Sequence, residues 1–225
     1  SSEKQGLINE LHSNARRNYP RRKVRILGIN DLYQADLIDM SSFASVNKNH
    51  HFALIVINAF SKFAFAEPLK TKTGIEVTEK MKKILEKAPP PSNLTVDQGK
   101  EFYNKHFKEL MRRYKINMYS VYSTKKASIV ERLNRTLKNK MWKRFSLNGT
   151  YKWIDMLQSI VDEYNNDIHR TIGLKPAEVS KDDEKHILDR INRDNSKNKI
   201  KSRKKLKVGD YVRISKLKGA FEKSY

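Results

Sequence analysis

The chain has 225 residues, enough for one domain with a sizeable core and a smaller appendage. Its 47 Lys and Arg against 25 Asp and Glu give a formal net charge of +22, which indicates an anionic partner. Nucleic acid is favoured over an anionic membrane, because no basic amphipathic helix with a large apolar face stands out. No apolar run approaches the roughly 20 residues of a membrane span. The absence of cysteine excludes disulfides and thiolate zinc sites, and it fits an intracellular protein.

The first 70 residues pass from a basic arm into strands. Residues 1–29 are polar and basic, and we expect a linker or arm there. Residues 33–40 predict a strand, and the continuous apolar run 52–57 predicts a second one buried on both faces. The segment 62–67 follows after a very short connection and predicts the hairpin partner of that run. Pro68 is expected to limit how far this third strand can pair.

Helices and short strands alternate in the next part of the chain. Thr73 and Glu76 have the spacing of a capping box, and the helix that they open should end at the prolines 89–91. A short strand over 94–96 stops at Asp97. A second helix and a strand over 116–121 follow. The apolar faces of the two helices comprise Val77, Met81, Ile84, Leu85 and Ala88 in the first, and Phe107, Leu110, Met111 and Tyr114 in the second.

Two further amphipathic helices complete the predicted core. After a polar loop at 123–126, a long helix carries Glu131, Arg135 and Lys138 on one stripe. The adjacent, buried stripe comprises Val130, Leu133, Leu137 and Met141, and the last helix buries Trp153, Leu157, Ile160, Val161 and Tyr164. The order β-β-β-α-β-α-β-α-α predicts an α/β fold with a mixed sheet flanked by helices.

Beyond residue 180 the chain is charged and poor in apolar residues. Residues 195–205 contain six basic residues and no acid, which predicts a solvated linker or a phosphate-contacting arm. Residues 207–214 predict a turn and a strand, and too few residues follow to build a domain. We therefore expect a basic linker over 181–205 and, over 206–225, the start of a truncated β-barrel.

Three acidic residues stand in settings that suit metal-ion chemistry. Asp36 lies in the first strand, Asp97 ends a later strand just before Gly99, and Glu131 lies near the start of the long helix. Mg²⁺ prefers oxygen ligands, and two such ions about 4 Å apart can stabilise both the attacking and the leaving oxygen of a phosphoryl displacement. Arg135 and Lys138 lie one and two turns beyond Glu131, where they could touch phosphates.

Each acid also has an ordinary structural interpretation. An Asp after a strand is usually a turn or cap residue, and Glu131 alone would be taken as an ion-pair partner of Arg135. Asp39 competes with Asp36 for the first position because both lie in the same strand region. The three acids are persuasive together because each occurs in the correct element of one fold order.

These residues resemble the retroviral-type (DDE) integrase family, and most closely the integrases of Polinton (Maverick) transposons. The resemblance covers nearly the whole chain, and its most specific part is the segment 126–138. The matching segments are Gln34-Ala35-Asp36-Leu37-Ile38-Asp39-Met40, 58–62, 68–74, 126–138, Tyr164-Asn165 with His169 and Pro176, and 207–210.

The resemblance implies an RNase H-like catalytic core over 30–180, with a five-stranded sheet, and an SH3-like or chromo-like barrel beginning at 206. It implies that Asp36, Asp97 and Glu131 are the catalytic and metal-binding triad for two Mg²⁺ or Mn²⁺ ions, and that Asp36 touches both. No zinc is expected, because the zinc module of many relatives needs cysteine. The implied DNA-binding residues are Lys125, Lys126, Arg132, Asn134, Arg135 and Lys138.

Relatives of this kind trim the 3′ ends of element DNA and then join them to target DNA. We therefore expect a DNA integrase, a polynucleotidyl transferase with nuclease activity, that works in the nucleus on element-end and target duplexes. An active form should be a homo-oligomer, and no membrane partner is expected. The alternative is a domesticated, catalytically silent DNA-binding module on the same fold. A ribonuclease H-type hydrolase shares the metal chemistry, but the helix around Glu131 matches integrases better.

Overall fold

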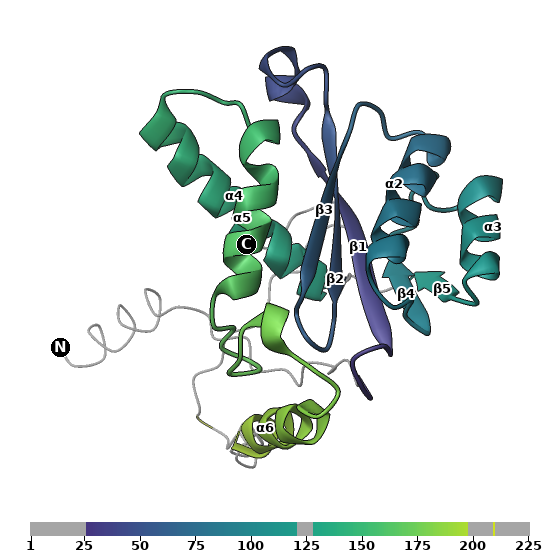
Figure 1. The fold of residues 1–225 in the computed structure, drawn as a ribbon, viewed down its shortest axis with the longest axis vertical. Helices are drawn as coiled ribbons and strands as arrows, with labels where there is room; N and C mark the ends of the chain where they lie inside the picture. Colours follow the sequence, from purple (N-terminus) through teal and green to yellow (C-terminus); the bar gives the residue numbers. More distant parts are fainter. Residues whose placement is uncertain (1–25, 121–127, 198–208, 210–225) are drawn as a thin grey trace. The chain divides into compact units, whose positions relative to one another are not determined.

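The computed structural model describes residues 26–120, 128–197 and 209 (Figure 1). Of the expected features, the N-terminal arm up to residue 25, the loop with Lys125 and Lys126, and the C-terminal barrel lie outside the described residues. In chain order the elements are β1 Leu32–Asp39, η1 Ser41–Val46, β2 Phe52–Asn58, β3 Ala64–Leu69, α2 Gly74–Lys87, β4 Asn93–Val96, α3 Lys105–Arg113, β5 Asn117–Ser120, α4 Ser128–Asn148, α5 Ile154–Asn166, η2 Pro176–Glu178 and α6 Glu184–Lys197.

The strands form one mixed five-stranded sheet with the order β3-β2-β1-β4-β5. β1, β2 and β3 are antiparallel neighbours, and β4 and β5 continue the sheet in parallel with β1. The expected α/β fold, a mixed sheet flanked by helices, is therefore confirmed. Among the described residues, no helix is long and apolar enough to cross a membrane.

Helices cover both faces of the sheet, because the strands bury side chains on both sides. α4 and α5 pack on one face and α2 and α3 on the other, and Figure 1 shows the two pairs on opposite sides of the strands. The predicted apolar stripes of all four helices point into these two cores. Their fully buried members include Val130, Leu137, Trp153 and Ile160 on the first face and Val77, Met81 and Phe107 on the second.

The third strand begins later and pairs further than predicted. Lys62 lies in the preceding turn, where its φ of 65° takes it out of the extended conformation. Pairing with β2 runs through Pro68, opposite Ala53, so the expectation that this proline limits pairing was wrong. β3 is an edge strand, and a proline is tolerated there when its nitrogen faces away from the neighbouring strand. Asn165 occupies that outer edge: its side chain accepts from the Ala64 N–H (2.8 Å) and donates to the Ala64 carbonyl (2.9 Å).

Helix α2 starts where the sequence predicts, at the N-cap Thr73, but without the capping box. The Thr73 side chain makes no cap hydrogen bond. The Glu76 carboxylate instead accepts from the backbone N–H groups of Lys70 (2.7 Å) and Thr71 (2.8 Å) and from the Thr71 hydroxyl (2.6 Å). Burial acts to raise the pKa of Glu76, but these hydrogen bonds from the preceding turn outweigh it and lower the pKa below its ordinary value.

A helix, α6, occupies most of the segment 181–205, where the sequence predicts a linker. Ile187 of α6 is fully buried in a third, small core with Phe60 and Ile172, and Ile26 and Ile29 from the predicted basic arm pack against it. Glu184 adds a polar contact, since its carboxylate accepts from the Ile29 N–H at 2.8 Å. Sparse apolar residues thus suffice for a helix here, because each of them meets this small core.

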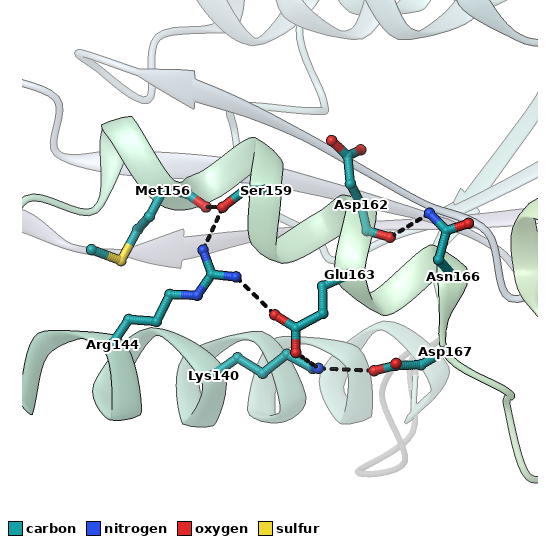
Figure 2. Close-up of polar contacts among 8 residues, drawn as sticks. All are labelled: Lys140, Arg144, Met156, Ser159, Asp162, Glu163, Asn166 and Asp167. Atoms are coloured by element: carbon teal, nitrogen blue, oxygen red, sulfur yellow. Dashed lines mark hydrogen bonds and ion pairs between the residues drawn. The ribbon is translucent and has the colours of Figure 1, made fainter. Parts of the chain in front are cut away.

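An ion-pair cluster joins α4 to α5 on the surface (Figure 2). Lys140 of α4 pairs with Glu163 (2.5 Å) and Asp167 (2.9 Å), and Arg144 pairs with Glu163 (2.8 Å) and donates to the Ser159 hydroxyl. Hydrogen bonds from Lys140, and then from Arg144, lower the pKa of the Glu163 carboxyl. Exposed pairs contribute little individually, so the cluster mainly orients two helices that the core already holds together.

Candidate active site

β1 turns two polar side chains toward α4. Successive residues of a strand point to opposite faces of the sheet, so Gln34, Asp36 and Ile38 share one face. Ile38 is buried in the core under α4 and α5, which identifies that face. Asp36 is thereby directed at the helix that carries Glu131, and the pleat alone accounts for its direction.

Gln34 fixes the start of α4 to the sheet. Its side chain is 2% exposed, and its Oε1 accepts from the backbone N–H groups of Ile129 (3.2 Å) and Val130 (3.1 Å). The first N–H groups of a helix have no partner within the helix, so a buried acceptor supplied by β1 satisfies two of them. This contact holds the first turn of α4, with Glu131, beside β1.

Asn134 connects Asp36 to α4 one turn beyond Glu131. Its amide Nδ2 donates to Asp36 Oδ2 at 2.8 Å, and Asp36 Oδ1 accepts from the Leu37 N–H at 2.9 Å. The Oδ1 atom of Asn134 is buried without a hydrogen-bond partner in the part of the chain that the structure describes. The sequence predicts Asn134 as a DNA contact, whereas its half-buried amide here orients the Asp36 carboxylate. Binding of DNA by this residue stays a prediction.

The parallel register of β1 and β4 directs Asp97 toward the same end of the sheet as Asp36. β1 and β4 are parallel, and Gln34 is paired with Thr95. The same register continued by two residues sets Asp36 opposite Asp97, on neighbouring strands that are about 4.8 Å apart in ordinary sheets. Asp97 is exposed, and its Oδ1 accepts from the Gly99 N–H at 3.1 Å in the turn that ends β4.

Glu131 lies in the first turn of α4 and is exposed, with Arg135 and Lys138 on the same exposed stripe as predicted. Arg132 is exposed beside it. None of these three cations forms an ion pair with another residue in 26–120 or 128–197, although the charge of Lys138 acts on the carboxylate of Asp39. They therefore give this end of α4 a positive surface.

The donor chemistry fits Mg²⁺ or Mn²⁺, because three carboxylates and an orphaned amide oxygen offer the hard oxygen ligands that these ions prefer. The positions fit less closely. Among the described residues, no three His, Asp or Glu side chains come together as a group that could hold a metal ion. The carboxylates of Asp36 and Asp97 instead accept from the backbone N–H groups of Leu37 and Gly99.

Asp39, the competitor of Asp36, has a different environment. It is exposed, and its carboxylate accepts from the Ser41 N–H at 2.9 Å. Because Asp39 lies three residues after Asp36 in the strand, its side chain points to the opposite face of the sheet. Hydrogen bonds from Ser41 lower the pKa of Asp39. The geometry therefore favours Asp36 over Asp39 as the partner of Asp97 and Glu131, a choice that rested on motif alignment alone.

Sequence reasoning missed a group of cations beside the start of α4. Burial, and then the charge of Arg132, lowers the pKa of the Lys62 ammonium to about 8. Burial, and then the charges of Lys62, Arg132 and Arg170, lowers the pKa of His169 to about 4. The left-handed turn at Lys62 turns this side chain inward, where its Nζ donates to the Ala59 carbonyl, and no local sequence signal announces that turn.

His169 should make the protein less stable in mild acid. Its pKa in the folded state is about 4 against an ordinary value of 6.5, so between these values the unfolded chain binds more protons. The contribution of His169 to stability is therefore fully present above pH 6.5 and is lost as the pH falls toward 4. We expect urea unfolding to show a loss of about 1 kcal/mol between pH 7 and pH 5, after a discount for partial solvent exposure. His169→Asn should remove most of this loss, and an unchanged loss would contradict the assignment.

The chain matches no protein-family model, but two kinds of relative share its sequence. It is 36% identical over 189 residues to a transposon-derived protein of Caenorhabditis elegans, covering 83% of this chain and 62% of that protein. It is 28% identical over 145 residues to the Gag-Pol polyprotein of woolly monkey sarcoma virus, covering 63% of this chain and 8% of the polyprotein. The chain thus spans less than two thirds of the worm protein and a small part of the viral one.

Solved structures share its fold. The integrase catalytic core domain of HTLV-2 in complex with magnesium, in a trimeric form, superposes with a TM-score of 0.57 at 17% identity and covers 69% of this chain and 99% of that domain. A chain of the simian T-cell lymphotropic virus intasome, in complex with PP2A regulatory subunit B56 gamma, gives 0.63 at 21% identity and covers 77% of this chain and 65% of that one. The chain therefore has the RNase H-like fold of a retroviral integrase catalytic core, and it is homologous to retroviral Pol integrase regions and to a transposon-derived protein.

Proposed function

We propose that this chain is the core of a DNA integrase that trims the 3′ ends of element DNA and joins them to target DNA. The observation that carries the proposal is the hydrogen bond from Asn134, one helical turn beyond Glu131, to Asp36, together with the parallel register of β1 and β4, whose last pair, Gln34 and Thr95, lies two residues before Asp36 and Asp97. The fold, shared with integrase catalytic cores, supports the same assignment.

Asp36, Asp97 and Glu131 would hold two Mg²⁺ or Mn²⁺ ions. The ions, when bound, would stabilise charge on the attacking and leaving oxygens of the phosphodiester. Gln34 and Asn134 act on the triad indirectly. Gln34 fixes the position of the first turn of α4 relative to β1, and Asn134 holds one oxygen of Asp36. Both residues would therefore orient the carboxylates toward a cation.

The cations of α4 would bind the DNA. Arg132, Arg135 and Lys138 are exposed on α4 near Glu131 and form no ion pair with the described residues, so a phosphate backbone is the ligand that their charge favours. Lys125 and Lys126 precede them in the chain and are proposed to contribute to the same surface. We further propose a Polinton-type element as the source, the nucleus as the site of action, and a homo-oligomer as the active form, in line with the intasome and the trimeric core among the structural relatives.

A catalytically silent DNA-binding module is the second candidate. The positions of the three carboxylates favour it, because no three acidic or histidine side chains among the described residues come together as a group that could hold a metal ion. Such a module would keep the fold and the positive surface while losing turnover.

The test is strand transfer with a labelled element-end duplex and a target duplex, in Mg²⁺ or Mn²⁺ and in EDTA. An integrase should join the labelled strand to the target only when the divalent ion is present. DNA binding without any joined product in either metal would favour the silent module. Absence of DNA binding would exclude both candidates.

A further inference from the structure

The outward face of α3 carries a stripe of cations. Lys105, Lys108 and Arg112 are exposed and follow one another at i, i+3 and i+7, which aligns them along one side of a helix. The opposite side is buried through Phe107, Leu110 and Met111, so the stripe points directly away from the core. In Figure 1, α3 lies outside α2, at the margin of this layer.

The charges of this stripe are not balanced by neighbours. On α2, Lys87 pairs with Glu67 and Lys82 with Glu86, and on α4 Lys140 and Arg144 share Glu163. No ion pair joins any of the α3 cations to a residue in the described part of the chain; Lys108 instead lies 5.9 Å from the centre of the Tyr103 ring. Glu109, the one acid within α3, lies on the same side of the helix at i+4 from Lys105 and i−3 from Arg112 without forming an ion pair with either, and Arg113 and Lys115 add exposed positive charge at the helix end, so the face keeps a net positive charge.

The stripe starts close to the candidate active site in the chain and runs away from it. α3 begins after the turn that follows Asp97, and it leads back to β5, which is parallel to β4. α3 therefore runs opposite to β4, and its three cations extend over about 10 Å from the end nearer Asp97, at 1.5 Å per residue. A DNA duplex carries one negative charge for about every 1.7 Å of its axis, so a stripe of this length spans several phosphates.

We propose that this face of α3 is a second DNA-binding surface, separate from α4, that holds the phosphate backbone of the target duplex. This inference rests on the proposed function. Lysine and arginine on one straight stripe neutralise phosphates, and a contact made to phosphates alone carries no sequence information. Such a contact suits a target that varies in sequence, whereas the ends of an element do not vary.

The test compares two triple variants that lose the same charge. Lys105→Gln, Lys108→Gln and Arg112→Gln remove the α3 stripe, and Lys82→Gln, Lys83→Gln and Lys87→Gln remove three exposed cations of the neighbouring α2. Binding of a short random-sequence duplex is measured over a series of salt concentrations. Each phosphate contact contributes about 0.9 to the slope of log K against log salt, so the α3 variant should lose up to about 2.7 and bind at least about tenfold more weakly at low salt. The α2 variant should lose less than about 1.

Equal changes in the two variants, or an unchanged slope in the α3 variant, would overturn the inference. Strand transfer by the unsubstituted protein separates this outcome from a failure of the proposed function. If joined product forms while the α3 slope is unchanged, only the α3 surface is excluded. If the α3 slope falls but no joined product forms, α3 still binds DNA, but the integrase assignment fails and with it the identification of the duplex as a target.

Discussion

Asp97→Asn should reduce strand transfer by at least about a thousandfold, which corresponds to about 4 kcal/mol of transition-state stabilisation. Removing one carboxylate lowers the negative charge that would hold a divalent ion between β1 and α4. The fold should be unaffected, because Asp97 is exposed and the oxygen of an asparagine can still accept from the Gly99 N–H. The measurement is the rate of joined-product formation with a labelled element-end duplex.

The matched control is Glu101→Gln, which removes the same charge from the turn that follows β4. It should keep strand transfer within a few-fold of the unsubstituted protein, and both variants should bind the duplex. Equal product from Asp97→Asn and the unsubstituted protein would remove Asp97 from the catalytic set. Equal losses in the two variants would mean that strand transfer depends on the negative charge of the loop and not on the Asp97 carboxylate as a metal ligand.

Gln34→Leu should destabilise the protein by about 2 to 4 kcal/mol. The substitution leaves the N–H groups of Ile129 and Val130 without their acceptor inside the structure, and each buried donor that loses its partner costs about 1 to 3 kcal/mol. The free energy of unfolding in urea measures this loss. Gln158→Leu, the same substitution at an exposed position of α5, should change stability by less than about 0.5 kcal/mol.

The Gln34 variant also separates positioning from bulk stability. Under conditions in which it remains folded, its strand transfer should fall more than its DNA binding, because the first turn of α4 carries Glu131 while the DNA-binding cations extend further along the helix. Activity equal to that of the unsubstituted protein at full folding would show that Gln34 has no part in setting the triad.

The regular elements could be predicted because their signals are local. Val77, Met81, Ile84 and Leu85 repeat at helical spacing, and the run 52–57 is apolar without interruption, so periodicity alone defines the helix and the strand. The exposed direction of Glu131 on α4 follows from the same reasoning. α6 could not be predicted in this way, since its burial depends on Phe60 and Ile172, which are distant in the chain.

Contacts between elements were beyond local patterns. Glu76 has the spacing of a capping box, yet its carboxylate accepts from Lys70 and Thr71, because the chain before α2 turns back over the helix end. In the sequence Gln34 is an ordinary polar residue of a strand. Its role becomes visible only when the start of α4 packs on β1 and donates two N–H groups to it. The amide of Asn134 likewise acquires its role from Asp36, which lies 98 residues earlier.

The proposed triad was predicted from the sequence by combining acids with their expected elements, and part of the arrangement of these acids follows from topology. The parallel register of β1 and β4 directs Asp36 and Asp97 to the same end of the sheet, and the choice of Asp36 over Asp39 follows from the pleat. The position of Glu131 relative to these two residues depends on the packing of α4 against β1 through Gln34, which lies about 95 residues earlier in the chain, so no local pattern encodes it.

The binding of Mn²⁺ by crystals of the protein tests the central claim most directly, through anomalous diffraction. The account predicts one or two anomalous peaks bounded by Asp36, Asp97 and Glu131, at the distances of about 2.0 to 2.2 Å that are usual for small divalent ions and oxygen ligands. Asp97→Asn crystals should lose at least one peak. Absence of any peak at these carboxylates, in crystals of protein that performs strand transfer in Mn²⁺, would contradict the account.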